Sequence, residues 1–191
     1  ASFDQLKNLM SKRVFRDEKD GKSFSPHRLM DGATRSNLGV EFLSMAVADI
    51  DDGISLDELR PAISQYTWIA TSSFSHTNDH PKFRLVFPLT RDVYTAEWKV
   101  FVAGFHSLLG NHVDPSTKDP ARFYFLPSCP EEFKDDVFYE VNEGEWMDPE
   151  SCLTAGMLLT GEAAPKIEDT FENEFGASQA EHPPSYLEYV E

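Results

Sequence analysis

Residues Met45–Gly53 read MAVADIDDG, an apolar run that ends in acidic residues two positions apart. In an extended strand, such side chains point to the same face, so Asp49 and Asp51 are expected to project side by side. Adjacent carboxylates repel each other unless a cation lies between them. A strand ending in a solvated acidic turn is the simpler interpretation, and a Mg²⁺ or Mn²⁺ site is the functional one.

The composition is that of a globular chain. Its 191 residues are enough for one well-buried domain, and 40% of them are hydrophobic and 13% aromatic. No apolar stretch approaches the roughly 20 residues of a membrane helix, and no secretory leader pattern is present, so we expect a cytoplasmic protein without a membrane partner. Cys129 and Cys152 form neither a metal-binding spacing nor a disulfide framework.

The net charge of −16 is unevenly distributed along the chain. Residues 131–191 contain 17 of the 33 acidic side chains but only 2 of the 17 basic ones, a local net charge of −15. The first 130 residues are therefore nearly neutral, and this part of the chain has enough cations to bind phosphate groups locally.

Hydrophobic periodicity predicts an α+β fold with the element order β-α-β-β-α-β. This is the order of the ferredoxin-like, RRM-like sheet, which carries its helices on one face. We expect residues 1–35 to form an N-terminal extension, 36–160 the catalytic domain and 161–191 an acidic tail or linker. Strands are predicted at 40–50, 67–74, 83–87, 122–126 and 137–141, and helices near 3–10, 55–65, 95–109 and 149–159.

Two further polar clusters lie at predicted strand ends. One is Ser75-His76, which follows the second strand and precedes Lys82 and Arg84. The other is residues 113–122, which read VDPSTKDPAR and lead into the strand at 122–126. In the predicted sheet, the first and third clusters are neighbours, so Asp114 is expected to join Asp49 and Asp51.

Each residue type in these clusters suits nucleotidyl transfer. Three carboxylates can hold one or two Mg²⁺ ions, which bind a triphosphate and lower the pKa of an attacking hydroxyl group. His76 and the cations Lys82, Arg84 and Arg122 are expected to bind the phosphates of an incoming nucleotide. Asp119 is expected to form a turn, and His80, His106 and His112 are expected to have no metal role, His106 at the surface or half-buried.

The three ordered clusters resemble the signatures of the archaeo-eukaryotic primase superfamily. The closer resemblance is to the primase or primase–polymerase domains of plasmids, phages and integrated elements, on Ser75-His76, Arg84 and residues 114–127. The resemblance covers about residues 36–130, and one departure is Phe74, which replaces a small residue two positions before His76. It implies that Asp49, Asp51 and Asp114 bind metal and that Ser75 and His76 contact the nucleotide.

The resemblance implies a metal-dependent, template-directed nucleotidyltransferase that takes a single-stranded DNA template, NTPs or dNTPs, and a replicative helicase as partners. An RRM-like module that binds single-stranded nucleic acid without chemistry is the alternative, and it requires exposed aromatic side chains on the central strands. A catalytically inactive interaction protein acting through its acidic tail is a further possibility. A relaxase is disfavoured, because the chain contains no His-x-His pair.

Overall fold

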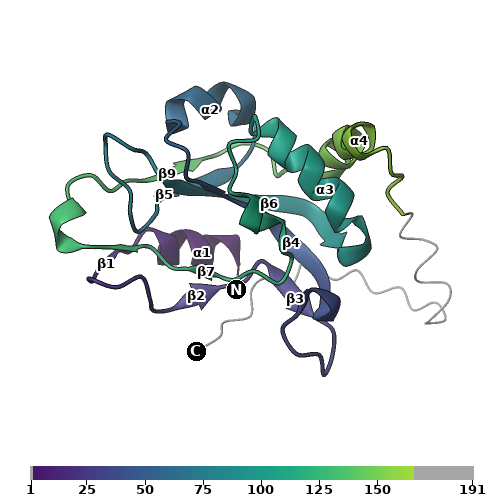
Figure 1. Cartoon of the computed structure of the whole chain (residues 1–191), viewed down its shortest axis with the longest axis horizontal. Helices are drawn as coiled ribbons and strands as arrows, with labels where there is room; N and C mark the ends of the chain where they lie inside the picture. The colour runs from purple at the N-terminus through teal and green to yellow at the C-terminus, as the bar shows by residue number, and fades with distance from the viewer. Residues whose placement is uncertain (1, 166–191) are drawn as a thin grey trace.

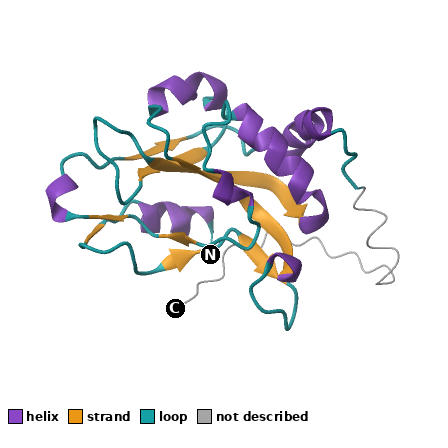
Figure 2. Ribbon diagram, in the orientation of Figure 1, coloured by secondary structure: helices purple, strands orange, loops and turns teal. Residues whose placement is uncertain are grey.

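The computed structural model describes residues 2–165 and is built around a five-stranded antiparallel sheet (Figures 1 and 2). The strand order is β3-β4-β6-β5-β9, and two smaller two-stranded sheets pair β1 with β8 and β2 with β7. The strands are β1 Val14–Phe15, β2 Ser23–Phe24, β3 His27–Leu29, β4 Val40–Ile50, β5 Trp68–Ser72, β6 Phe83–Tyr94, β7 Tyr124–Phe125, β8 Ser128–Cys129 and β9 Tyr139–Asn142. The helices are α1 Phe3–Met10, α2 Leu56–Ile63, α3 Thr95–Leu108 and α4 Pro149–Thr160, with short 3₁₀ turns at Asn37–Gly39, Pro115–Lys118 and Glu131–Phe133.

Both faces of the large sheet are covered, which explains why β4 is buried along almost its whole length. Successive side chains of a strand point to opposite faces, so Ala46 and Ala48 join the core on one side while Met45 and Val47 join a second core on the other. Figure 1 shows α2, α3 and α4 above the sheet and α1 with the small strands below it. The two helices expected for the sheet, α2 and α3, thus share one face, whereas α1 of the N-terminal segment buries Phe3, Leu6 and Met10 in the second core on the other.

The predicted strand at 122–126 is wrong as a member of the main sheet. Only Tyr124–Phe125 is extended, and it pairs with β2 instead. Prolines at 120 and 127 flank this segment, and proline lacks the N–H that a longer strand would need for its ladder. The position beside β4 is taken by β3, and β9 occupies the far edge beside β5. The α+β class is confirmed, whereas the specific RRM-like topology is not.

The N-terminal segment is an integral part of the domain. Residues 2–35 contribute α1 to the second core and β3 to the sheet, so they pack as part of the domain core. The acidic tail expected at 161–191 lies outside the described residues beyond position 165.

The predicted helices are confirmed, and their ends follow local chemistry. The Ser55 hydroxyl accepts a hydrogen bond from the Glu58 N–H, and the Glu58 carboxylate accepts one from the Ser55 N–H, which is a capping box for α2. After α3, Gly110 adopts a positive φ of 64° that terminates the helix. Within the described part of the chain, no helix combines the length and apolar character that crossing a membrane requires.

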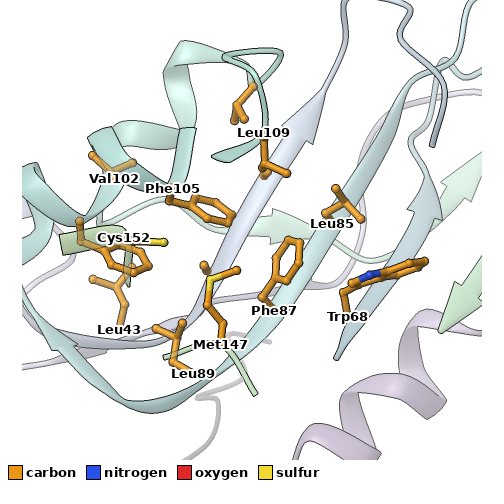
Figure 3. Close-up of a cluster of buried hydrophobic side chains, with 14 of the residues drawn as sticks. Leu43, Trp68, Leu85, Phe87, Leu89, Val102, Phe105, Leu109, Met147 and Cys152 are labelled. Carbon is orange, nitrogen blue, oxygen red and sulfur yellow. The ribbon is translucent and has the colours of Figure 1, made fainter. Parts of the chain in front are cut away.

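The larger core lies between the sheet and the helices α2, α3 and α4 (Figure 3). The Phe87 ring of β6 meets the Phe105 ring of α3 edge-on, with centroids 5.6 Å apart. Trp68 of β5 is fully buried, and its indole N–H donates to the Ile63 carbonyl at the end of α2. The first contact joins α3 to β6, and the second joins α2 to the neighbouring strand β5.

Helices α3 and α4 cross at two glycines that permit backbone-to-backbone contact. A Cβ atom placed on Gly104 would lie 1.9 Å from the Cys152 carbonyl oxygen, and one on Gly156 would lie 1.9 Å from the Val100 carbonyl oxygen. Both obstacles are backbone atoms, so a side-chain rotation cannot relieve either clash. Glycine at these positions sets the separation of the two helices.

Gly104→Ala is expected to destabilise the domain, because α4 would have to move away from α3 to make room for the methyl group. Overpacking of this kind costs about 1–3 kcal/mol in the free energy of unfolding, and the rigid backbone favours the upper end. Urea unfolding followed by circular dichroism measures the effect. Ser107→Ala, on the same helix, is the control and should change stability by less than about 0.5 kcal/mol. Equal midpoints for both variants would contradict the close crossing.

Candidate active site

A row of polar side chains crosses the sheet on the face that α1 partly covers. Asp49 of β4 pairs directly with Arg84 of β6, and Arg84 pairs on its other side with Thr71 of β5. The neighbouring positions on this face, Val47 and Val86, belong to the second core. The row therefore marks the point where the apolar interior of this face gives way to a polar end.

Asp49 and Arg84 form a bidentate ion pair that is largely shielded from water. Arg84 Nε donates to Asp49 Oδ1 at 2.7 Å and Nη2 donates to Oδ2 at 3.1 Å. The two side chains are only 12% and 11% exposed. The third donor of the guanidinium, Nη1, bonds the Phe125 carbonyl oxygen at 2.7 Å, which ties the sheet to the β7 segment. Paired, charge-assisted hydrogen bonds of this geometry are among the stronger polar interactions in proteins.

Tyr124 lies beneath two guanidinium groups. Its ring centroid is 4.7 Å from the Arg84 guanidinium carbon and 5.8 Å from that of Arg122, both within cation–π range. Burial raises the pKa of the Tyr124 hydroxyl, and the nearby Asp49 carboxylate raises it further. The ring is therefore neutral and holds both cations at the polar end of the sheet.

Asp114 is brought next to Asp49 by an extension of the sheet. Ile50 and Val113 form an isolated antiparallel bridge, and the Asp114 N–H donates to the Asp49 carbonyl oxygen at 2.8 Å. Arg122 Nη2 lies 3.8 Å from Asp114 Oδ2 and 4.0 Å from Asp49 Oδ2, between the two carboxylates. The predicted proximity of the first and third clusters is thus present in the structure.

The turn that carries Asp114 is held by its own side chains. Burial opposes the charged form of Asp114, but hydrogen bonds from the Ser116 hydroxyl and N–H, together with Arg122, outweigh it and lower the pKa of the carboxyl group. The Asp119 carboxylate accepts the Ala121 N–H at 2.9 Å, in agreement with its expected role in a turn. Asp114 is consequently ionised at neutral pH.

Buried His106 supports this turn from α3. The Thr117 hydroxyl donates to the Asp114 carbonyl at 2.7 Å, so it has only its lone pairs left for His106 Nε2, 3.2 Å away. His106 is assigned on this basis as the neutral tautomer with the proton on Nε2. Burial lowers its pKa to about 4, with help from Lys118. The expectation of a surface or half-buried His106 is wrong, because Thr117 gives the ring a partner inside the core.

Asp51 completes the acidic group but remains exposed. Partial burial raises the pKa of its carboxyl group, and the negative charges of Asp49 and Asp114 raise it further. Lys82 and Lys19 oppose this shift, so both cations lie within the electrostatic field of the carboxylates. The three predicted acidic residues therefore share one region of the molecule.

The donor set fits a hard divalent ion in its chemistry, since Mg²⁺ and Mn²⁺ prefer carboxylate oxygens. In the present arrangement, however, both oxygens of Asp49 are bonded to Arg84. Within residues 2–165, no three His, Cys, Asp or Glu side chains are positioned to hold a metal ion. A metal ligand role for Asp49, Asp51 and Asp114 remains a prediction.

His76 is placed inside the loop that follows β5. Its Nδ1 accepts the Lys82 N–H at 3.0 Å, and its ring packs edge-on against Phe138 with centroids 5.3 Å apart. Burial lowers the pKa of His76, so the ring is neutral, as its acceptor role requires. Ser75, next to it, is exposed on the turn. The loop geometry gives His76 a positioning role for Lys82, and the contacts of Ser75 and His76 with a nucleotide remain predictions.

A cleft opens between the end of the sheet and the β7–β8 segment. It is small, and Arg84, Thr71 and Phe74 lie in its wall. Lys19, from the loop after β1, also lines it. Arg13 braces the same region, because its guanidinium donates to Thr71 Oγ1, the Ser72 carbonyl and the Phe138 carbonyl. Two cations, Lys19 and Arg84, therefore line this cleft, and the second of them is paired with Asp49.

Several residues of the site carry no clear sequence signal. Thr71 and Tyr124 lie in sequence patterns that predict strands and give no indication of a role in the site. Lys19 and Arg13 belong to the polar N-terminal segment, where basic and acidic residues are mixed without a recognisable motif. Only the folding of this segment over the sheet brings them to the cleft.

The fold and site together define an α+β domain that places carboxylates and guanidinium groups at one end of a sheet. The chain belongs to the family of the VapE N-terminal domain, which matches residues 7–157. This match confirms the resemblance to primase-type domains of phages and plasmids. No curated protein matches the chain.

A solved structure with a related fold is the AEP domain of the primase–polymerase from cyanophage S-2L. The two chains share 16% sequence identity and a TM-score of 0.46. The similarity covers 63% of this chain and 64% of that domain, so this chain spans less than two thirds of its length.

Asp49→Asn is expected to lower the free energy of unfolding by about 3–5 kcal/mol, because it leaves the Arg84 charge unpaired in a shielded position. Urea unfolding measures the change. The matched control is Asp57→Asn, which breaks an exposed pair with Arg60 and should cost less than about 1 kcal/mol. A similar small loss for both variants would show that the Asp49–Arg84 pair contributes little.

His106→Gln is expected to change how stability depends on pH. The folded protein holds His106 neutral down to about pH 4, while the unfolded chain takes up the proton near its ordinary value of 6.5. Stability from this group is therefore complete above about pH 6.5 and is lost as the pH falls towards about 4. Urea midpoints across this range should fall less steeply in the variant than in the wild type. Parallel curves would contradict the burial of a neutral His106.

Proposed function

We propose that this domain is a metal-dependent, template-directed nucleotidyltransferase of the DNA primase or primase–polymerase type. It would act in the replication of a plasmid, phage or integrated element. The observation that carries the proposal is the proximity of Asp49, Asp51 and Asp114 to one another and to Arg84 and Arg122, next to the cleft that Arg84 lines. Membership of the VapE N-terminal domain family supports the same class.

The charges at the cleft suit a nucleoside triphosphate. Lys19, Lys82 and Arg122 would bind and orient phosphate oxygens, and the planar guanidinium of Arg122 allows a bidentate contact. Asp49, Asp51 and Asp114 would hold Mg²⁺ or Mn²⁺, which would supply charge neutralisation for the phosphates and lower the pKa of the attacking hydroxyl. Tyr124 and the turn at 114–118 keep these groups oriented before the substrate arrives.

The partners follow from this class of reaction. The site would take a single-stranded DNA template together with NTPs or dNTPs, and the family membership is consistent with a helicase as a further partner. Lys19 and Arg84 line the cleft, and Lys82 and Arg122 lie near the neighbouring carboxylates, whereas residues 131–191 are strongly acidic. Electrostatic attraction therefore favours phosphate binding at the cleft over other regions.

The alternative, an RRM-like module that binds nucleic acid by base stacking, has little support in the surface of the sheet. That mode needs exposed aromatic rings on the central strands. Among the described residues, the rings of Phe42, Phe83, Phe87 and Trp68 on β4, β6 and β5 are buried. The polar end of the sheet presents an ion pair instead of a stacking platform.

Asp51→Asn and Asp114→Asn are expected to reduce template-directed incorporation of labelled nucleotide by about a hundredfold or more, because each removes a carboxylate from the proposed metal site. The assay uses a single-stranded DNA template, Mg²⁺ or Mn²⁺ and either NTPs or dNTPs, with products resolved by length. Asp57→Asn, an exposed acid on α2, is the matched control and should retain wild-type incorporation. Unchanged incorporation by the first two variants would overturn the proposal.

A further inference from the structure

The Asp49–Arg84 pair poses a question about how a metal ion enters the site. Asp49 is expected to bind metal, yet its two oxygens already accept hydrogen bonds from Arg84 at 2.7 and 3.1 Å. Arg122 lies 4.0 Å from the same carboxylate. A divalent ion approaching Asp49 therefore meets two positive charges within a few ångströms, where water screens them poorly.

We propose that Arg84 competes with the divalent ion for Asp49, so that metal binds tightly only after Arg84 has moved onto a phosphate group. This inference rests on the proposed function, because it assigns a second role to a residue of the same site. When substrate binds, the partner of Arg84 then changes from the Asp49 carboxylate to a phosphate group. In the metal-free domain, the charge of the Asp49 carboxylate is balanced by Arg84.

The location of Arg84 makes this exchange possible. Its side chain lines the cleft, where an entering phosphate would meet it. A phosphate offers the same bidentate geometry to a guanidinium as a carboxylate does. The Tyr124 ring, 4.7 Å away, and the Phe125 carbonyl bound to Nη1 can keep the guanidinium near the cleft while its contact with Asp49 breaks.

The exchange also keeps every charge compensated. An unpaired carboxylate or guanidinium in this shielded position would be costly, so neither residue is expected to remain alone. Phosphate would replace Asp49 as the partner of Arg84, and the metal ion would replace Arg84 as the partner of Asp49. By thermodynamic linkage, triphosphate then raises the affinity for metal, and metal raises the affinity for triphosphate by the same factor.

The test measures Mn²⁺ binding to the whole chain without nucleotide, from the electron paramagnetic resonance signal of free Mn²⁺. Arg84→Gln removes the competitor and is expected to bind Mn²⁺ about tenfold more tightly than the wild type. The double variant Asp49→Asn, Arg84→Gln should lose this gain. Arg60→Gln is the matched control, because it removes an arginine paired with Glu140 and Asp57 on α2 and should leave Mn²⁺ affinity unchanged.

Two further measurements keep the result interpretable if Arg84→Gln folds poorly. Arg84→Lys keeps the charge but loses the bidentate fork, so it should show a smaller gain in Mn²⁺ affinity. Thermal unfolding with and without Mn²⁺ should show a larger metal-induced rise in Tm for Arg84→Gln than for the wild type, because the ion binds only the folded state. Equal Mn²⁺ affinities in wild type, Arg84→Gln and Arg84→Lys would overturn the competition.

The competition and the proposed function fail in different ways. Wild-type nucleotide incorporation with no gain in Mn²⁺ affinity on replacing Arg84 would overturn the competition and leave the enzyme intact. A gain that depends on Asp49, in a protein that incorporates no nucleotide, would support the competition and overturn the nucleotidyltransferase. A gain that persists in the double variant would place the metal elsewhere and overturn the competition.

Discussion

The buried ion pair between Asp49 and Arg84 is the interaction on which the arrangement of this domain's polar end depends. Two charges withdrawn from water stabilise a fold only when both are fully hydrogen-bonded. Asp49 supplies two acceptors, and the Phe125 carbonyl supplies the third. The pair thus joins two central strands to the β7 segment, and the carboxylates, the cleft and the Tyr124 ring take their places around it.

Coverage of both sheet faces is the second constraint. The run Val40–Ile50 is apolar at nearly every position, so each face of β4 must be buried against another layer. Helices α2, α3 and α4 supply one layer. Helix α1 and the small strands supply the other, and β7 covers the row that contains Asp49 and Arg84, where Tyr124 and the Phe125 carbonyl contact Arg84. The cleft lies between this second layer and the end of the sheet, with residues of the β7–β8 segment in its wall.

Local sequence patterns predict the elements of this fold better than their arrangement. The apolar run of β4, the Ser55–Glu58 capping box and the periodicity of α3 depend on neighbouring residues, so the sequence contains the information directly. The pairing of β7 with β2 and the place of β3 beside β4 depend on contacts between distant segments. Asp49, Asp114 and Arg84 were found by their motif, whereas Lys19 and Arg13 reach the site through the folding of the N-terminal segment.

The N-terminal segment has a consequence for any attempt to isolate a smaller catalytic core. A fragment beginning at residue 36 would lack β3 and leave the backbone of β4 unpaired along the stretch that β3 covers. It would also expose Met45, Val47 and Val86 to water, which α1 and its neighbours otherwise shield. A bare strand edge next to an apolar surface promotes self-association. Soluble expression therefore requires that shortened versions retain residues 2–35.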